Sequence, residues 1–136
     1  MNKWLTLCLA LCCSGAMAEE KNCSSDQSLE YIASCYDNLV NRYDQQLNQA
    51  YEALKSHVST MRYDAEIKNE YWTTMAQAQR SWLKMRDNQC LAQGYFSTND
   101  NSSGDIEIDK CMIKTIKQRI TFFRQEIAYL RALPLG

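Results

Sequence analysis

The chain has few residues that interrupt helices and few that commonly catalyse reactions. Its 136 residues include four Gly, one Pro and one His. Gly and Pro most often end helices and form turns, so their scarcity predicts long helices. The single histidine, His57, falls at the expected end of a helix, where it fits a cap better than a catalytic base.

Sequence motifs of common enzymes and metal sites are also absent. No P-loop, dinucleotide-binding glycine pattern, H-E-x-x-H segment or EF-hand loop occurs. We therefore predict that the protein is not an enzyme and that it uses no metal and no cofactor. The formal net charge of −1 is mildly acidic, which argues against nucleic acid and anionic lipid as partners and is compatible with a basic protein partner.

The first eighteen residues have the features of a cleaved signal peptide. Lys3 precedes a short apolar run, residues 4–13, and Ala16 to Ala18 form an A-x-A cleavage site before Glu19. Neither this run nor any later segment approaches the ~20 apolar residues that a membrane helix needs. We therefore predict a signal peptide over residues 1–18, a periplasmic or secreted mature protein, and no membrane association after cleavage.

Cleavage would leave residues 19–136, enough for a single domain with one modest core. Four of the seven cysteines would remain: Cys23, Cys35, Cys90 and Cys111. An even number in a short exported chain predicts two disulfides, and their wide spacing disfavours a zinc site.

The helical periodicity suggests how these cysteines pair. Cys90 and Cys111 would face each other across a helical hairpin and close a loop of about 22 residues. Cys23 and Cys35 would be about 18 Å apart in one continuous helix, so their bond requires Cys23 on a leader that folds back. The crossed pairings remain open at this stage.

Apolar residues recur at intervals of three and four over three segments, about 28–57, 64–93 and 107–130. In the second segment the predicted inner face is Ile67, Tyr71, Met75, Ala78, Trp82 and Met85. The stretch from Tyr95 to Gly104 is rich in Ser, Asn, Asp and Gly and predicts a surface loop. We expect an all-α fold, an antiparallel three-helix bundle with two disulfides.

Each helix also carries polar residues beside aromatic ones on a common face. They are Asp44, Asn48 and Tyr51 in the first, Gln79, Trp82 and Arg86 in the second, and Thr115 and Arg119 in the third. Polar groups that border a core must be paired, so the simpler interpretation is an interhelical network in which Asp44 and Asn48 meet Arg86 or Arg119. The alternative interpretation is a binding surface.

These residues also carry a resemblance to a known family. The pattern D-x-x-L-N-x-x-Y is matched by Asp44, Leu47, Asn48 and Tyr51; the pattern Q-R-x-W-x-x-x-R-D-x-x-C by Gln79, Arg80, Trp82, Arg86, Asp87 and Cys90; and the closing segment CMIKTIKQR contains Cys111, Thr115 and Arg119. In these blocks the chain resembles the LprI family, the lysozyme inhibitor LprI-like N-terminal domain of exported bacterial proteins. The resemblance extends from Cys23 to about Arg124.

The resemblance implies an exported binding protein that inhibits a lysozyme. Such an inhibitor would act by occlusion, with an acidic loop steered to the groove of a basic enzyme. The candidate partner-binding loop comprises Tyr95, Phe96, Asp100, Asp105, Glu107 and Asp109. The same acids at a helix N-terminus also have a structural explanation in the helix dipole. The alternative function is a periplasmic protein-interaction, envelope-stress or immunity module without lysozyme activity.

Overall fold

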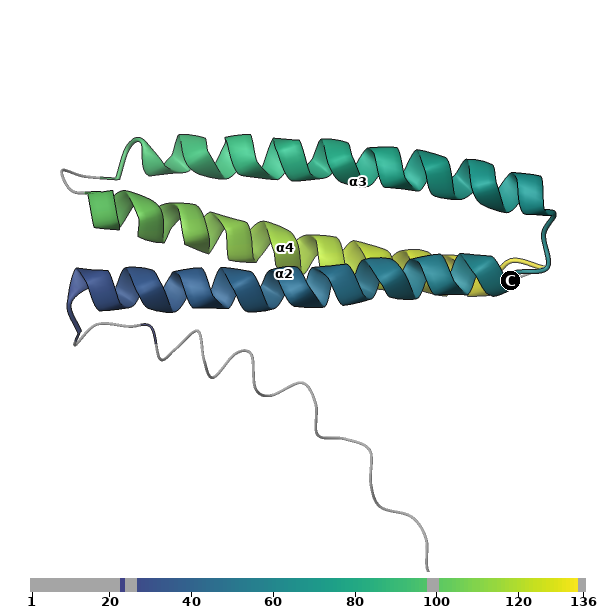
Figure 1. Ribbon diagram of the computed structural model, residues 1–136, viewed down its shortest axis with the longest axis horizontal. Helices are drawn as coiled ribbons and strands as arrows, with labels where there is room; N and C mark the ends of the chain where they lie inside the picture. The colour runs from purple at the N-terminus through teal and green to yellow at the C-terminus, as the bar shows by residue number, and fades with distance from the viewer. Residues whose placement is uncertain (1–22, 24–26, 98–100, 135–136) are drawn as a thin grey trace, which may run out of the picture.

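The computed structural model describes residues 23, 27–97 and 101–134, which form three helices. Helix α2 spans Leu29–Thr60, α3 spans Ala65–Gly94 and α4 spans Asn101–Arg131. They lie side by side in an elongated bundle, with the α2–α3 connection at one end and the α3–α4 connection at the other (Figure 1). The predicted all-α three-helix bundle with two disulfides is confirmed.

The predicted signal peptide lies outside this description. Residues 1–18, the expected signal peptide, are not among the described residues. Across the part of the chain that the structure describes, no helix combines the length and the apolar character needed to cross a bilayer.

Polar side chains cap both ends of α2. The Ser28 side chain accepts a hydrogen bond from the backbone N–H of Tyr31 at 3.3 Å, which is the usual role of an N-cap serine. At the other end, the hydroxyls of Ser59 and Thr60 donate to the carbonyls of Ser56 and His57, each at 2.7 Å. Because these side chains fold back on the last turn, the helix continues three residues beyond its predicted end.

Helix α4 begins well before its predicted start near Glu107. The segment from Asn101 to Gly104 has the composition of a loop, yet it is helical. Ile106 is buried, and a Cβ on Gly94 would lie 2.7 Å from the Ile108 side chain and 3.2 Å from the Gly104 carbonyl. This close packing of α4 against the end of α3 overrides the weak local helix propensity. The predicted Tyr95–Gly104 loop was therefore wrong in its second half.

The apolar core lies mainly between α2 and α4, which make the most extensive contact in the bundle. Leu54, Ile116 and Phe123 have no exposed surface, and Leu39 and Ile113 are 1 % exposed. These residues belong to the periodic apolar faces that the sequence predicts for the first and third helices. Helices α2 and α4 thus form a tightly packed pair, and α3 packs against it, mainly through α4.

Helix α3 buries only part of the face that was predicted: Tyr71, Met75 and Trp82 do pack against the core. Ile67 and Met85, both expected inside, are 52 % and 47 % exposed, whereas its buried residues are Gln79, Arg86 and Cys90. Two of these three are polar, so a search for apolar periodicity could not find them. From the end of α3 back to its start, successive residues of α3 contact residues that lie further and further along α4. The pairs are Cys90 with Cys111, Gln79 with Arg119, and Tyr71 with Glu126.

Candidate functional site

Both disulfides have the pairing that the spacing favoured. Cys90 is bonded to Cys111 and Cys23 to Cys35, with Cα–Cα distances of 5.3 Å and 5.6 Å. Both bonds lie toward the end of the bundle that holds the start of α2 and the α3–α4 connection (Figure 1). We call this the disulfide end, and the end with the α2–α3 connection the open end.

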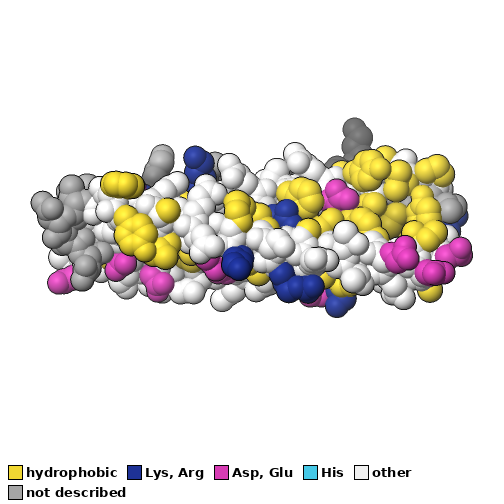
Figure 2. Space-filling view, turned by 90° about the horizontal axis from the view of Figure 1, so that it is seen from above, with side chains coloured by type: hydrophobic (Ala, Val, Ile, Leu, Met, Phe, Trp, Pro, Cys, Tyr) yellow, Lys and Arg dark blue, Asp and Glu magenta, His cyan; other side chains and the backbone are white. Residues whose placement is uncertain are grey.

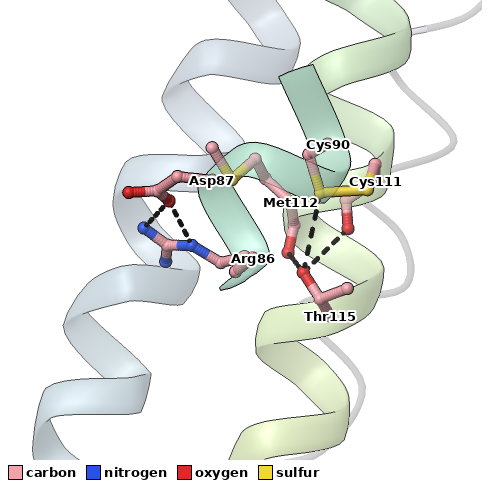
Figure 3. Close-up of a disulfide and its surroundings, with 6 residues drawn as sticks. All are labelled: Arg86, Asp87, Cys90, Cys111, Met112 and Thr115. Carbon is pink, nitrogen blue, oxygen red and sulfur yellow. Dashed lines mark hydrogen bonds and ion pairs between the residues drawn. A yellow bond between two sulfur atoms is a disulfide. The ribbon is translucent and has the colours of Figure 1, made fainter. Parts of the chain in front are cut away.

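Thr115 belongs to the surroundings of the Cys90–Cys111 bond. Its hydroxyl oxygen lies 3.0 Å from the carbonyl oxygens of Cys111 and Met112, to which it donates, and 4.0 Å from the Cys90 sulfur (Figure 3). The side chain thereby satisfies its own hydrogen-bonding capacity within α4 while it fills space beside the disulfide. Its position explains the family-motif threonine in structural terms.

Arg86 joins α3 to α2 through an ion pair with Asp44, which is partly exposed. Its side chain is 10 % exposed, and its Nη1 atom lies 2.8 Å from Asp44 Oδ1. The neighbouring Asp87 accepts from the Nε and Nη2 atoms of Arg86 at 2.9 Å and 2.8 Å (Figure 3 shows this second pair). Two carboxylates therefore compensate one buried guanidinium, as a buried charge requires. The expected contact between Asp44 and Arg86 is present.

Arg119 makes a different contact from the one proposed for it. Its Nε atom donates to Gln79 Oε1 at 2.8 Å, and its guanidinium lies within 4.3–5.5 Å of the rings of Phe122, Phe123 and Trp82. Burial among these rings lowers the pKa of Arg119, because the charged form loses hydration. Arg119 thus forms the network with Gln79 and Trp82 instead of with Asp44 or Asn48.

A pocket of about 320 Å³ opens between α2 and α3. At one end of its lining, Asp44 and Arg86 connect the two helices, and at the other the Tyr51 ring contacts Trp72 at 4.8 Å between centroids. Several polar residues of the family motifs line it. The full lining is Asp44, Leu47, Asn48, Tyr51, Ala76, Gln79, Arg80, Leu83 and Arg86.

The candidate partner-binding residues divide between a turn and a helix. Tyr95 and Phe96 follow α3 directly and are 76 % and 94 % exposed. Ser97 stabilises this turn, because its backbone N–H and its hydroxyl donate to the Gly94 carbonyl at 3.2 Å and 3.1 Å. Asp100 lies outside the described residues.

The three remaining candidates, Asp105, Glu107 and Asp109, lie on the first turns of α4 and not on a loop. Glu107 forms a salt bridge with Lys110 at 2.8 Å. Burial, with the nearby charges of Asp37 and Asp105, raises the pKa of Asp109 to about 6. The placement of these acids on a helix instead of a loop matters for recognition, because the helix holds them beside the exposed aromatic pair.

Within the described part of the chain, no group of three or more His, Cys, Asp or Glu side chains could hold a metal ion. His57 lies in the last turn of α2, and its Nε2 atom is buried without a hydrogen-bond partner among the described residues. Nothing in its surroundings pairs it with a nucleophile.

A family model described as "Lysozyme inhibitor LprI" matches residues 20–123. The chain belongs to the LprI family. The matched range contains both disulfides, all of α2 and α3, and α4 as far as Phe123. No curated protein and no solved structure matches the chain. Membership of the LprI family implies a role in lysozyme inhibition among exported proteins, with a protein as the partner.

One charged residue of this pocket was not singled out as a candidate from the sequence. Arg80 is exposed on α3 and lines the pocket beside Gln79. Its place in the Q-R-x-W pattern was the available signal. An exposed arginine is unremarkable in a helix, so only the position of α2 across the pocket distinguishes Arg80 from the other surface cations.

Proposed function

We propose that this protein is an exported inhibitor of a lysozyme and that it acts by inserting the disulfide end of the bundle into the substrate groove. The inserted surface, which we call the tip, consists of Tyr95, Phe96, Asp105, Glu107 and Asp109. Export follows from the expected signal peptide and from two disulfides, which persist in oxidising compartments.

The exposure of Phe96 is the observation that carries this proposal. A phenylalanine that is 94 % exposed beside a tyrosine that is 76 % exposed leaves a large apolar area in water. Aromatic side chains are frequent anchors in protein interfaces, where they fill pockets of the partner. Here they directly follow Gly94, the last residue of α3, which lies four residues beyond the cross-linked Cys90. The backbone of this turn would therefore lose little conformational freedom on binding.

The charge of the tip supports the same partner. Asp105 and Glu107 are exposed, and Asp109 is half-buried close to Asp37. In Figure 2 acidic side chains lie at both ends of the molecule, and most of the basic side chains in view lie nearer the middle. An acidic tip would be attracted to a basic enzyme and would approach it end-on.

The test is inhibition of lysozymes of several types by the mature, oxidised protein, measured as the rate of cell-wall lysis. We expect inhibition of at least one type and a loss of about 100-fold or more in potency for the double variant Tyr95→Ala/Phe96→Ala. The matched control is Tyr129→Ala on α4, which removes an aromatic ring that is 60 % exposed away from the tip and should leave inhibition unchanged.

A second pair of variants tests the charge. Asp105→Asn/Glu107→Gln should slow association and weaken its dependence on salt, whereas Glu66→Gln/Glu70→Gln on α3 should do neither. Absence of inhibition for every lysozyme type would reject the proposed function and favour a protein-interaction or immunity module. Undiminished inhibition by the aromatic double variant would reject the tip as the binding surface.

A further inference from the structure

The pocket between α2 and α3 exists because the two helices touch at few points. Most of their packing is against α4, and their own contacts include the Asp44–Arg86 ion pair and the Tyr51–Trp72 ring contact. The space between these contacts measures about 320 Å³, near the lower limit of the roughly 300–1,000 Å³ typical of small-ligand sites. Its size is therefore suited to a small molecule.

Hydrogen-bond donors in this pocket are oriented by the structure around them. The Nε atom of Arg119 donates to the side-chain oxygen of Gln79, which fixes the orientation of the Gln79 amide. The amide nitrogen of Gln79 is consequently left as a donor in the pocket that the residue lines. An oriented donor loses little freedom when a ligand accepts from it.

Arg80 supplies a positive charge that nothing in the described residues neutralises. No hydrogen bond or ion pair of the Arg80 side chain is found among them, and the same holds for the Asn48 side chain across the pocket. Arg86 differs, because Asp44 and Asp87 compensate its charge. The influence of Arg80 reaches Tyr51: burial and Glu52 raise the pKa of Tyr51, and Arg80 acts against them.

Two acceptors of the pocket are already bonded to arginines. Asp44 is the one carboxylate in the lining, and it is bonded to Arg86. The Gln79 oxygen is bonded to Arg119. Partner-free donors on Arg80, Gln79 and Asn48, next to the apolar surfaces of Leu47 and Leu83, therefore favour a ligand that is rich in acceptors and carries negative charge.

We propose that this pocket binds a small ligand that carries one carboxylate together with amide or hydroxyl groups, of the size of a single sugar ring or an acetylated amino acid. Arg80 pairs with the carboxylate, and Gln79 and Asn48 bind the neighbouring polar groups. The proposal does not depend on lysozyme inhibition, because the pocket and the tip share no residue.

The test is a titration of the ¹⁵N-labelled mature protein, followed by NMR, with three probes. N-acetylmuramic acid carries a carboxylate, an amide and hydroxyl groups; N-acetylglucosamine lacks the carboxylate; N-acetylalanine keeps the carboxylate and the amide without the sugar. We expect saturable shifts with N-acetylmuramic acid, centred on residues 44–51 and 76–86, and at least tenfold weaker binding of N-acetylglucosamine.

Arg80→Gln should weaken binding of N-acetylmuramic acid at least tenfold, since it removes the charge from an exposed side chain that makes no hydrogen bond or ion pair among the described residues. Lys84→Gln, which removes an exposed cation one turn further along α3 and outside the lining, is the matched control and should bind like the unmodified protein. The double variant Tyr95→Ala/Phe96→Ala should also retain binding, which separates this site from the tip.

Some outcomes distinguish between two sources of the ligand, and others would overturn the proposal. Equal binding of N-acetylalanine would support the proposal and assign the ligand to acylated amino acids, whereas its failure beside N-acetylmuramic acid would assign it to acidic sugars. Three results would overturn the proposal: no saturable shift with either carboxylate, equal binding of N-acetylglucosamine, or an Arg80→Gln variant with unchanged affinity.

Discussion

The disulfide end and the open end of the bundle are stabilised by different interactions. Cys23–Cys35 and Cys90–Cys111 cross-link the first, where burial and the nearby carboxylates of Asp37 and Asp105 raise the pKa of Asp109. At the open end, Leu54, Val58, Met61 and Leu130 are buried. Covalent bonds therefore hold the end proposed for recognition, and apolar burial holds the opposite end.

Polar contacts complete the open end without covalent bonds. Lys68 donates to the carbonyls of Ser59 and Met61, each at 3.2 Å, and so closes the turn between α2 and α3. Tyr71 donates to Glu126 at 2.9 Å. Hydrophobic side chains gather on the surface around this end (Figure 2), over an apolar pocket of about 190 Å³ whose lining includes Ile67 and Leu133. The comparison shows that a narrow bundle can present unfavourable charge at one end when cross-links hold that end closed.

The largest effect on stability is expected from the core toward the open end. Leu54→Ala should lower the free energy of unfolding by about 3–4 kcal/mol, because Leu54 is fully buried and no disulfide limits the separation of the helices there. Denaturant unfolding of the oxidised protein measures this loss. Leu29→Ala, at a position that is 47 % exposed, should cost well under 1 kcal/mol. A loss below 1 kcal/mol for Leu54→Ala would contradict the assignment of the core.

Removal of the Cys90–Cys111 bond should lower the free energy of unfolding by about 3 kcal/mol. The unfolded chain gains conformational entropy when these two residues, 21 positions apart, are no longer joined. The double variant Cys90→Ser/Cys111→Ser should also exchange its backbone amide hydrogens faster near the α3–α4 connection than near residues 58–68. Equal acceleration at both ends would show that the disulfide does not act locally.

A smaller effect is expected from the hydrogen bond between Tyr71 and Glu126. Burial, together with the hydrogen bond and the charge of Glu126, raises the pKa of Tyr71, so the hydroxyl remains a donor at neutral pH. Tyr71→Phe should cost about 1 kcal/mol in thermal or denaturant unfolding. Tyr129→Phe, which removes the hydroxyl from a more exposed ring on α4, should change stability by less than ~0.5 kcal/mol.

The last substitution, Asp109→Asn, is expected to increase the stability of the protein. Because the pKa of Asp109 is raised to about 6 from an ordinary value of 3.8, the folded protein binds this proton more tightly than the unfolded chain. The resulting stabilisation is complete below about pH 4 and is lost as the pH rises through 6. Asp109→Asn should therefore stabilise the protein at pH 7.5 by about 1 kcal/mol, and by nothing at pH 4. Melting curves at the two pH values check this, with Glu70→Gln as a control.

The features predicted best depend on short stretches of sequence. Apolar periodicity located α3 to within one residue at each end, although Ile67, Ala78 and Met85, which it placed inside, are exposed. The disulfide pairs are the ones that helix geometry favoured, because Cys90 and Cys111 flank the connection of a hairpin and Cys23 precedes the helix that carries Cys35. The start of α4 was missed since Ser102, Ser103 and Gly104 favour a loop until they pack against α3.

The candidate site was predicted only in part. Two of the interhelical contacts join polar residues named from the sequence, since Asp44 lies against Arg86 and Gln79 against Arg119. Their partners were not all correct, and Asn48 is exposed at the pocket instead of being paired with an arginine. Side-chain pairing across helices depends on the rotation of each helix about its axis, which residue spacing does not specify.

The sequence by itself determined the number of helices, the long uninterrupted runs that form them and the preferred cysteine pairs, because helix propensity and helical rise act between residues close together in the chain. Only the tertiary structure decided that α3 buries Gln79 and Arg86, that α4 begins at Asn101, and that α2 and α3 enclose a pocket. Each of these depends on contacts between residues distant in sequence, whose free energies outweigh local preferences.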